Sequence, residues 1–467
     1  MRLSFLTLYM KNIIIVLVLF SFIFLPSRGA AQDENQTVIQ SIFDNALSTD
    51  IAYKQLEKLC KEAPGRLIGT PNSFKSVGLM KEYLTNLGAD TVFLQSFTSP
   101  AWICHSAFLT MTIDGKEIPL QVDALGPCGS TPLPGIHAEI IEVMSLDEVR
   151  ELGKEKIEGK IVFFNRPMNT TYFNVFKAYS EAVDQRYWGP SLAQEYGAVG
   201  SITRSANPNM DDFPHTGSCR MEGNKIPAIA ISTNDAEKLS KVLKSNPQLK
   251  VNIQVDAEDI TTQSYNLIAD LKGSEKPNEY IIVAGHLDAW HNTEGAHDDG
   301  VGCLQSTEVL RLFKQLGLNN KRSIRVILYM DEELYQSGGN AYVVYSKEQQ
   351  VMNYFAIESD AGGFSPRFFS VDAPDIVLEK IKKYESFLKP YGIEEITAGG
   401  SGVDIGPMKE LGVPLSGYRT DWQRYFDMHH SANDTFDQVN FREMQLGSGA
   451  MASFVYLIDK YDLANQN

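Results

Sequence analysis

The chain has few cysteines for its length, and they are scattered. Its 467 residues include only five, at positions 60, 104, 128, 219 and 303. No two of them form a Cys-x-x-Cys pair, so the sequence has neither a disulfide scaffold nor a zinc–thiolate motif. An odd number leaves at least one thiol unpaired within a monomer, even in an oxidising compartment. We therefore expect these cysteines to be mostly structural.

Positive charge is also scarce. The 42 Lys and Arg residues face 58 Asp and Glu residues, which gives a formal net charge of -16 and a pI near 5.0. This balance argues against a protein that binds nucleic acid or an anionic membrane surface. The composition is otherwise that of a globular protein, 43% hydrophobic and 21% charged. A chain of this length predicts two domains.

Long apolar runs are absent except at the N-terminus. Arg2 and Lys11 precede an apolar run from Ile13 to Leu25, and small residues follow in PSRGAAQ. This order is typical of a secretory signal peptide, and the run is short for a membrane span. We predict that residues 1–31 are a signal peptide and that the protein is exported to the periplasm or outside the cell. After removal of the signal we expect no stable membrane insertion; an uncleaved anchor stays an alternative.

The remaining chain divides into three parts by its hydrophobic pattern. Residues 32–117 begin with two helical patterns, IAYKQLEKLCKEAP and PNSFKSVGLMKEYLTNLG, followed by the strand pattern TVFLQSF. Residues 118–258 contain short apolar runs such as HAEIIEV, GKIVFFN and IPAIAIS, which predict a small inserted unit. Residues 259–467 alternate apolar strands with helices. This alternation predicts an α/β fold with a mostly parallel sheet covered by helices.

Ionisable side chains follow the ends of several predicted strands. His286 and Asp288 follow IIVAG, Glu332 and Glu333 follow RVILYM, and Asp360 follows YFAIES. Because functional sites in such sheets gather at the carboxyl ends of the strands, we expect these residues to converge. Imidazole and carboxylate groups are the usual protein ligands of catalytic zinc. The pattern therefore indicates a zinc centre.

The stretch GAHDDGVG, residues 295–302, has two interpretations. Asp is a favoured helix N-cap and glycines suit a tight turn, so a cap is one of them. The other is a carboxylate that bridges two metal ions, since its two oxygens can each bind one. Beside His286 and Asp360, we interpret Asp298 as the bridge and Asp299 as structural.

Five motifs carry a family resemblance. HLDAW, GAHDDGVG, MDEELYQSGG, ESDAGGF and YFDMHHSANDT resemble, in order and spacing, the co-catalytic zinc exopeptidases of the bacterial aminopeptidase and glutamate carboxypeptidase type. Within that family, ESDAG and YFDMHHSANDT are most similar to the plasma glutamate carboxypeptidase branch. GRLIGTPNS and FTSPAW extend the similarity over most of the mature chain. The segment 118–258 is similar to the protease-associated domain inserted in such enzymes. The resemblance implies the zinc exopeptidase fold.

The resemblance also implies a ligand set for two Zn²⁺ ions per chain. One ion would be bound by His286 and Asp360, and the other by Glu333 and His430. Asp298 would bridge both ions.

Further roles follow from the same resemblance. Glu332 would be the general base, and Asp288 would orient the His286 ring, which fixes its tautomer. His429 stands where several relatives carry a Tyr that supports the oxyanion. His429 and Tyr425 are therefore weaker candidates for an oxyanion or substrate contact.

The prediction is a secreted zinc-dependent metallo-exopeptidase that hydrolyses short peptides or dipeptides. Its partners would be peptide substrates rather than nucleic acid, and a homodimer is compatible with the sequence. One alternative is a catalytically inactive binding module. Another is an acyl transferase of the glutaminyl cyclase type, with a single zinc on the same fold. The sequence leaves open whether the enzyme is an aminopeptidase, a carboxypeptidase or a dipeptidase.

Overall fold

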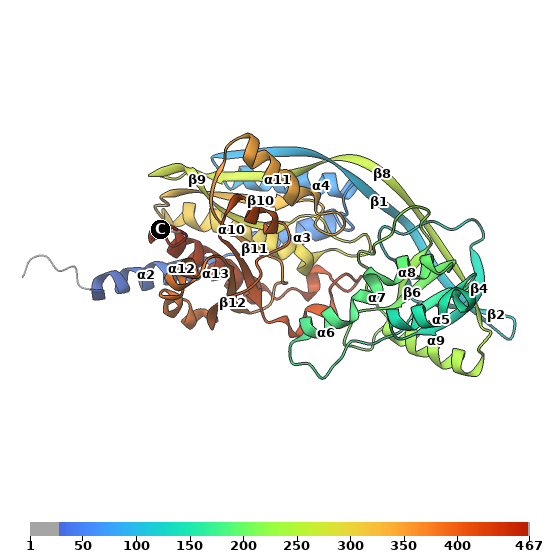
Figure 1. The fold of residues 1–467 in the computed structure, drawn as a ribbon. Helices are drawn as coiled ribbons and strands as arrows, with labels where there is room; N and C mark the ends of the chain where they lie inside the picture. Colours follow the sequence, from blue (N-terminus) through green and yellow to red (C-terminus); the bar gives the residue numbers. More distant parts are fainter. Residues whose placement is uncertain (1–27, 466–467) are drawn as a thin grey trace, which may run out of the picture.

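Two long strands run side by side through the molecule in the computed structural model, which describes residues 28–465 (Figure 1). β1 (Thr91–Ile113) and β8 (Lys250–Leu271) pair antiparallel from Thr91 opposite Asp270 to Met111 opposite Val251. One end of this ribbon belongs to a larger lobe and the other end to a smaller lobe. The ribbon thereby joins all described strands into one 14-stranded network.

The sheet of the larger lobe has four parallel strands at its centre. The order across the sheet is β13-β12-β14-β11-β9-β10-β8. The bounds are β9 (Lys276–His286), β10 (Arg322–Tyr329), β11 (Met352–Ser359), β12 (Pro366–Asp372), β13 (Glu395–Ala398) and β14 (Leu415–Thr420). β10, β9, β11 and β14 are parallel, whereas β8 and β12 pair antiparallel with their neighbours. The predicted helix-covered α/β fold is confirmed, with antiparallel strands on both sides of the parallel centre.

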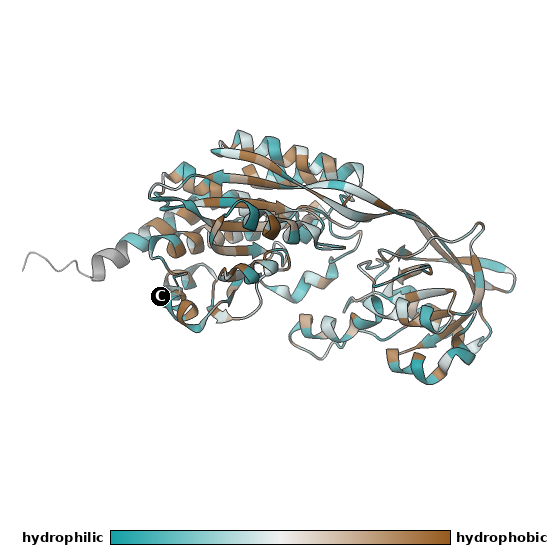
Figure 2. Cartoon of the chain, turned by 45° about the horizontal axis from the view of Figure 1, so that its top comes forward, coloured by the Kyte–Doolittle hydropathy of each residue, from teal (hydrophilic) through white to brown (hydrophobic). Residues whose placement is uncertain are grey.

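Side chains alternate between two apolar cores on the two faces of this sheet. Ile281 and Val283 pack into one core, and Ile282 and Ala284 into the other. The first core is covered by α2 (Arg28–Leu47), α3 (Ile51–Glu62), α4 (Pro71–Asn86), α10 (Val301–Leu316), α12 (Asp375–Lys382) and α13 (Phe441–Lys460). The second is covered by α11 (Ser337–Glu348) and the 3₁₀ helix η4 (Gly406–Leu411). Because both faces are covered, the central strands are almost continuously hydrophobic (Figure 2).

The smaller lobe has its own sheet and core. Its strands are β2 (Lys116–Leu120), β3 (Val122–Ala124), β4 (Ile136–Val143), β5 (Ile161–Phe164), β6 (Gly200–Arg204) and β7 (Ala228–Ile231). Its helices are α5 (Leu146–Ile157), α6 (Val175–Ala182), α7 (Asp184–Tyr187), α8 (Gly189–Glu195) and α9 (Thr233–Ser245). β4 to β7 are parallel, and β4 pairs antiparallel with β8. Residues 118 and 258, the predicted limits of the insert, lie in β2 and β8, so both limits fall inside strands and the long ribbon crosses the second one.

Short helical turns complete the larger lobe. They are η1 (Ala296–Gly300), η2 (Glu385–Phe387), η3 (Lys389–Tyr391), η5 (Trp422–Asp427) and η6 (Phe436–Gln438). Most of the predicted signal peptide lies outside the described residues. Within residues 28–465, no helix is long and apolar enough to span a membrane. All five cysteines are free thiols, and four of them are buried.

Candidate metal centre

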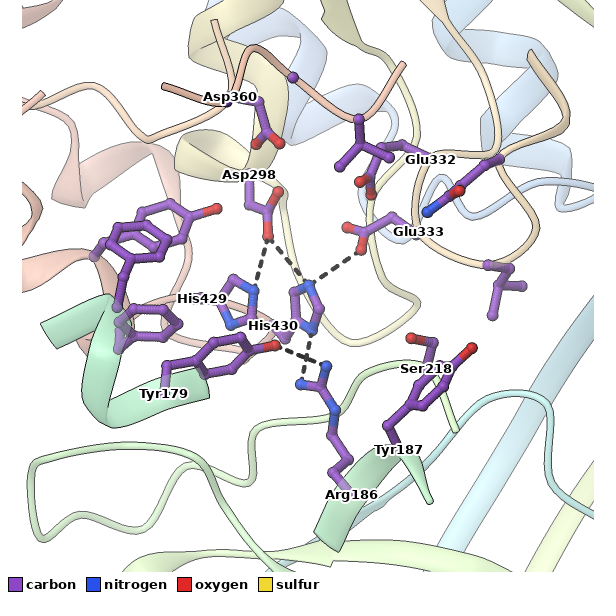
Figure 3. A pocket seen from close by; sticks show the side chains of 18 of the residues that line it. Tyr179, Arg186, Tyr187, Ser218, Asp298, Glu332, Glu333, Asp360, His429 and His430 are labelled. Carbon is purple, nitrogen blue, oxygen red and sulfur yellow. Dashed lines mark hydrogen bonds and ion pairs between the residues drawn. The ribbon is translucent and has the colours of Figure 1, made fainter. Parts of the chain in front are cut away.

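The carboxyl ends of the central strands bring the predicted ligands together. His286 is the last residue of β9, Glu333 follows β10, and Asp360 directly follows β11. Parallel strands end at the same edge of the sheet, so these three side chains meet there. Asp298 comes from η1, and His430 from the segment after η5. In Figure 3, the side chains of Asp298, Glu333, Asp360 and His430 face a common space.

Asp298 lies between two groups of side chains. Its Oδ1 is 3.2 Å from His286 Nε2, which is itself 3.6 Å from Asp360 Oδ1. Its Oδ2 is 3.4 Å from His430 Nε2, which is 3.1 Å from Glu333 Oε2. Each oxygen of this one carboxylate therefore faces a separate His–carboxylate pair. This is the arrangement expected of a bridging ligand.

Several atoms at this point are buried without hydrogen bonds. Within the described chain, His286 Nε2, Asp298 Oδ2 and Glu333 Oε1 have no hydrogen-bond partner. An unsatisfied buried polar group costs about 1–3 kcal/mol, so native structures avoid such groups. Burial and the neighbouring Asp298 also raise the pKa of Glu333 well above its usual value. Cations between these carboxylates would relieve both penalties, so the residues present fit a metal centre.

The histidine rings are turned so that Nε2 faces the carboxylates. His286 Nδ1 is 3.2 Å from the backbone oxygen of Asp288, and His430 Nδ1 is 3.3 Å from that of Thr216. A carbonyl oxygen only accepts, so Nδ1 of His286 carries the proton and its Nε2 keeps its lone pair for a ligand bond. Nδ1 of His430 also lies 3.5 Å from the Arg186 guanidinium, which only donates. Thr216 belongs to the smaller lobe. That lobe therefore contacts the ring of His430, one of the predicted ligands.

Besides its backbone oxygen, the side-chain carboxylate of Asp288 also lies near the His286 ring. Its Oδ1 is 3.7 Å from His286 Nδ1, and it also accepts the backbone N–H of Glu332 at 3.2 Å. Its Oδ2 accepts the backbone N–H of Glu333 at 3.3 Å. Asp288 thus lies where it can position both the His286 ring and the turn that carries the two glutamates.

Asp298 and Asp299 point in different directions and have different partners. Asp299 Oδ2 accepts the backbone N–H of His286 at 3.1 Å, and its Oδ1 accepts that of Gly302, in the first turn of α10, at 3.0 Å. Asp299 also lies within metal-ligand reach of His286 and Asp360, but both its oxygens are already engaged. Asp299 therefore caps the helix, whereas Asp298 faces the pocket.

The turn around these residues is held from two sides. Asp434 accepts the backbone N–H groups of His297 at 2.7 Å and Asp298 at 3.1 Å. Gly295 has φ of 60°, and a Cβ atom there would lie 2.3 Å from the Ala289 side chain. The glycine is therefore required by both the left-handed backbone and the close packing.

The motif GRLIGTPNS contributes Arg66, which is fully buried. Its guanidinium donates to the backbone oxygens of Leu287 at 2.5 Å, Glu294 at 2.6 Å and Gly295 at 2.7 Å. These three acceptors lie at both ends of the loop that joins β9 to η1. A residue more than 200 positions away thus holds the loop that carries Asp298.

The centre opens into a cavity of about 680 Å³ that both lobes line. The smaller lobe supplies Tyr179, Arg186, Tyr187 and Ser218, and Arg186 points toward His430 in Figure 3. Arg186 donates to Tyr179 Oη at 2.8 Å and to the Thr216 oxygen at 3.2 Å. Sequence reasoning missed these residues, because no motif or spacing in 118–258 marks them.

The other predicted residues also line this cavity. The ring of His429 stacks on that of His430, with centroids 3.5 Å apart, and its Nε2 is 4.0 Å from Asp298 Oδ2. Burial and the nearby Arg186 hold the pKa of His429 well below its usual value, so its ring is neutral. Burial raises the pKa of Tyr425, and its ring centroid lies 5.2 Å from that of His429. Glu332 and Arg419 complete the cavity wall from the larger lobe.

Known proteins resemble this chain over most of its length. Residues 266–455 match the model of peptidase family M28. Carboxypeptidase Q of Bos taurus is 31% identical over 413 residues, which cover 87% of this chain and 85% of that protein. Carboxypeptidase Q of Homo sapiens is also 31% identical, over 412 residues, with 87% and 85% covered.

Solved structures agree with this likeness. The crystal structure of a peptidase M28 precursor from Shewanella amazonensis SB2B has a TM-score of 0.87 and 30% identity, covering 93% of this chain and 98% of that one. A zinc aminopeptidase from Bacillus subtilis shares the fold, with a TM-score of 0.63 at 20% identity and coverage of 87% and 94%. From these likenesses, the chain belongs to peptidase family M28 and is a metallopeptidase.

Proposed function

We propose that this metallopeptidase is an exported di-zinc exopeptidase that hydrolyses short peptides, dipeptides first. The observation that carries the proposal is the position of Asp298, whose two oxygens face two separate His–carboxylate pairs. The apolar run near the N-terminus supports export. The curated relatives named carboxypeptidase Q support exopeptidase action on peptides.

Five residues would hold the metals. His286 and Asp360 would bind one zinc, Glu333 and His430 the other, and Asp298 both. When bound, the two ions would supply Lewis acidity, which lowers the pKa of water and polarises a carbonyl group.

Glu332 is the residue we assign as the general base. Its side chain lines the cavity, and its carboxylate makes no hydrogen bond within the described chain. Burial, with Asp360 and Asp298 nearby, raises its pKa well above the usual value. Cations in the centre would reverse this and keep the group ionised. Glu332 would accept the proton of the attacking water as the C–O bond forms, and pass it to the amine as the C–N bond breaks.

The cavity offers partners for both ends of a short peptide. Arg186 and Arg419 present guanidinium groups to the cavity, and this group suits a free carboxylate. A free amine would meet the carboxylates around Glu332. The volume of about 680 Å³ lies in the range of small-molecule sites. His429 and Tyr425 would contact the substrate or the oxyanion.

Two measurements test this function. Elemental analysis of the purified chain is expected to find about two zinc ions; one would support the glutaminyl cyclase type of chemistry, and none a binding module. The second is an assay with a dipeptide, its N-blocked form and its C-amidated form. Hydrolysis of the free dipeptide alone would identify a dipeptidase. Cleavage of the blocked form would identify a carboxypeptidase, and cleavage of the amidated form an aminopeptidase.

A further inference from the structure

A second group of metal-binding side chains lies outside the catalytic centre, where the two lobes meet. Cys104 belongs to β1, Asp123 to β3 in the smaller lobe, and His291 to the loop between β9 and η1. Asp123 follows Cys104 by 19 positions (123 − 104), and His291 lies 168 positions beyond Asp123. The proposed catalytic set uses none of them.

The geometry of this group is compact. One ligand atom from each residue lies within 4.8 Å of the others, and His291 Nε2 is 2.8 Å from Asp123 Oδ1. The His291 and Asp123 side chains are only 14% and 16% exposed. His291 Nδ1 is buried and has no hydrogen-bond partner within the described chain. The His291 and Asp123 side chains are therefore mostly shielded from water, and Nδ1 of the His291 ring is unsatisfied.

Local backbone structure places these side chains. The register between β1 and β8 shifts between Cys104 and Ser106, and such a bulge redirects neighbouring side chains. Asp123 Oδ1 also accepts the backbone N–H of Ala124 at 2.8 Å, which holds the carboxylate in place. The His291 ring lies edge-on to Trp102, with centroids 5.6 Å apart.

We propose that Cys104, Asp123 and His291 form a separate site for one borderline divalent cation, Zn²⁺ above all. Thiolate, imidazole and carboxylate together match the ligand preferences of zinc, and a water molecule would complete a tetrahedral set. The hard cations Ca²⁺ and Mg²⁺ prefer oxygen ligands only, so a site with sulfur and nitrogen excludes them.

This cation would link the two lobes through its ligands. It would join β1 and β3 to the loop that carries Trp290, a fully buried residue adjacent to His291. The Trp290 ring lies 5.5 Å from the ring of His430, one of the proposed zinc ligands. Burial lowers the pKa of His291, but the adjacent Asp123 carboxylate raises it to about 10. A cation therefore displaces a proton from this ring when it binds.

Cobalt substitution of the full exported chain tests the site. Co²⁺ bound to a thiolate gives a sulfur-to-metal charge-transfer absorption in the near ultraviolet, and the proposed catalytic ligands include no sulfur. The wild-type protein loaded with Co²⁺ is expected to show this absorption. Cys104→Ser is expected to abolish it and to lower the metal content by about one ion per chain. Asp123→Asn keeps the thiol and is expected to weaken Co²⁺ binding at this site.

His105→Ala is the matched control, because His105 lies on the same bulge but is exposed and pairs with Glu258. This variant is expected to keep both the absorption and the metal content. The far-ultraviolet circular dichroism of each variant checks that it folds. Absence of the absorption in the folded wild type would overturn the proposal, because the three residues would then form only a hydrogen-bonded group. Equal metal content in wild type and folded Cys104→Ser would overturn it as well.

Discussion

Replacement of Glu332 by Gln separates the chemistry from metal binding. The amide has nearly the same size, and within the described chain Glu332 donates a hydrogen bond through its backbone N–H only, so the substitution breaks no hydrogen bond. It also removes one negative charge from a site where Asp360 and Asp298 already repel it. We therefore expect the variant to fold and to keep its metals. Loss of a general base costs about 10²–10⁴-fold in rate, or about 2.7–5.4 kcal/mol in activation free energy.

The assay compares kcat for a dipeptide with zinc content from elemental analysis. Glu333→Gln is the control, because Glu333 lies next in the chain but contacts His430 at 3.1 Å. That variant is expected to lose zinc and activity together. If Glu332→Gln keeps its metals and its kcat stays within about tenfold of the wild type, the loss of rate is smaller than that expected for a general base. This result would refute the mechanism.

Four further predictions concern metal binding and stability. Asp298→Asn is expected to lower zinc content and turnover together, whereas Asp299→Asn keeps more of its metal; equal zinc content in the two variants would argue against a bridging Asp298. Asp434→Ala leaves two buried backbone N–H groups without acceptors, at about 1–3 kcal/mol each, so calorimetry should find a lower melting temperature. Arg325→Met leaves Asp270 buried without its bidentate partner, so urea unfolding should find the free energy of unfolding lowered by about 3–5 kcal/mol. The matched variant Arg367→Met removes the more exposed partner of Asp421 and should lower it by about 0–1 kcal/mol. A zinc chelator such as 1,10-phenanthroline should abolish activity and added Zn²⁺ should restore it; full activity after complete metal removal would contradict a metal-dependent reaction.

Local sequence signals predicted most helices and the central strands. PNSFKSVGLMKEYLTNLG forms α4, which begins at Pro71 after the Thr70 cap, as its residue types indicate. Apolar runs predicted the parallel strands because both faces of that sheet are buried. The segment GPMKEL forms the six-residue 3₁₀ helix η4 rather than an α-helix.

The long ribbon was only partly predictable. TVFLQSF indicated a strand, yet β1 continues past Pro100 to Ile113. Between the lobes, residues 103–108 of β1 and 256–263 of β8 contain no buried side chain, so no apolar alternation marks this part of the ribbon. The hydrophobic pattern therefore marked the start of β1 but not its length.

The sequence by itself determined the residue types of the centre and the strand ends that carry them. The order of His286, Asp298, Glu333, Asp360 and His430 was visible in the motifs, because each follows a strand or turn with its own local signal. Only the tertiary structure decided that Asp298 faces the pocket while Asp299 caps α10, since both residues have the same chemistry and differ only in orientation.

The tertiary structure also decided what surrounds these ligands. Thr216 and Arg186 reach His430 from the other lobe across more than 200 residues, and Arg66 and Asp434 hold the loop that carries Asp298. The first two contacts depend on how the two lobes pack along a shared ribbon, and the last two on how distant segments of the larger lobe pack together. A local sequence pattern depends only on the few residues around it. It could therefore indicate the predicted ligands, but not the distant residues that orient them.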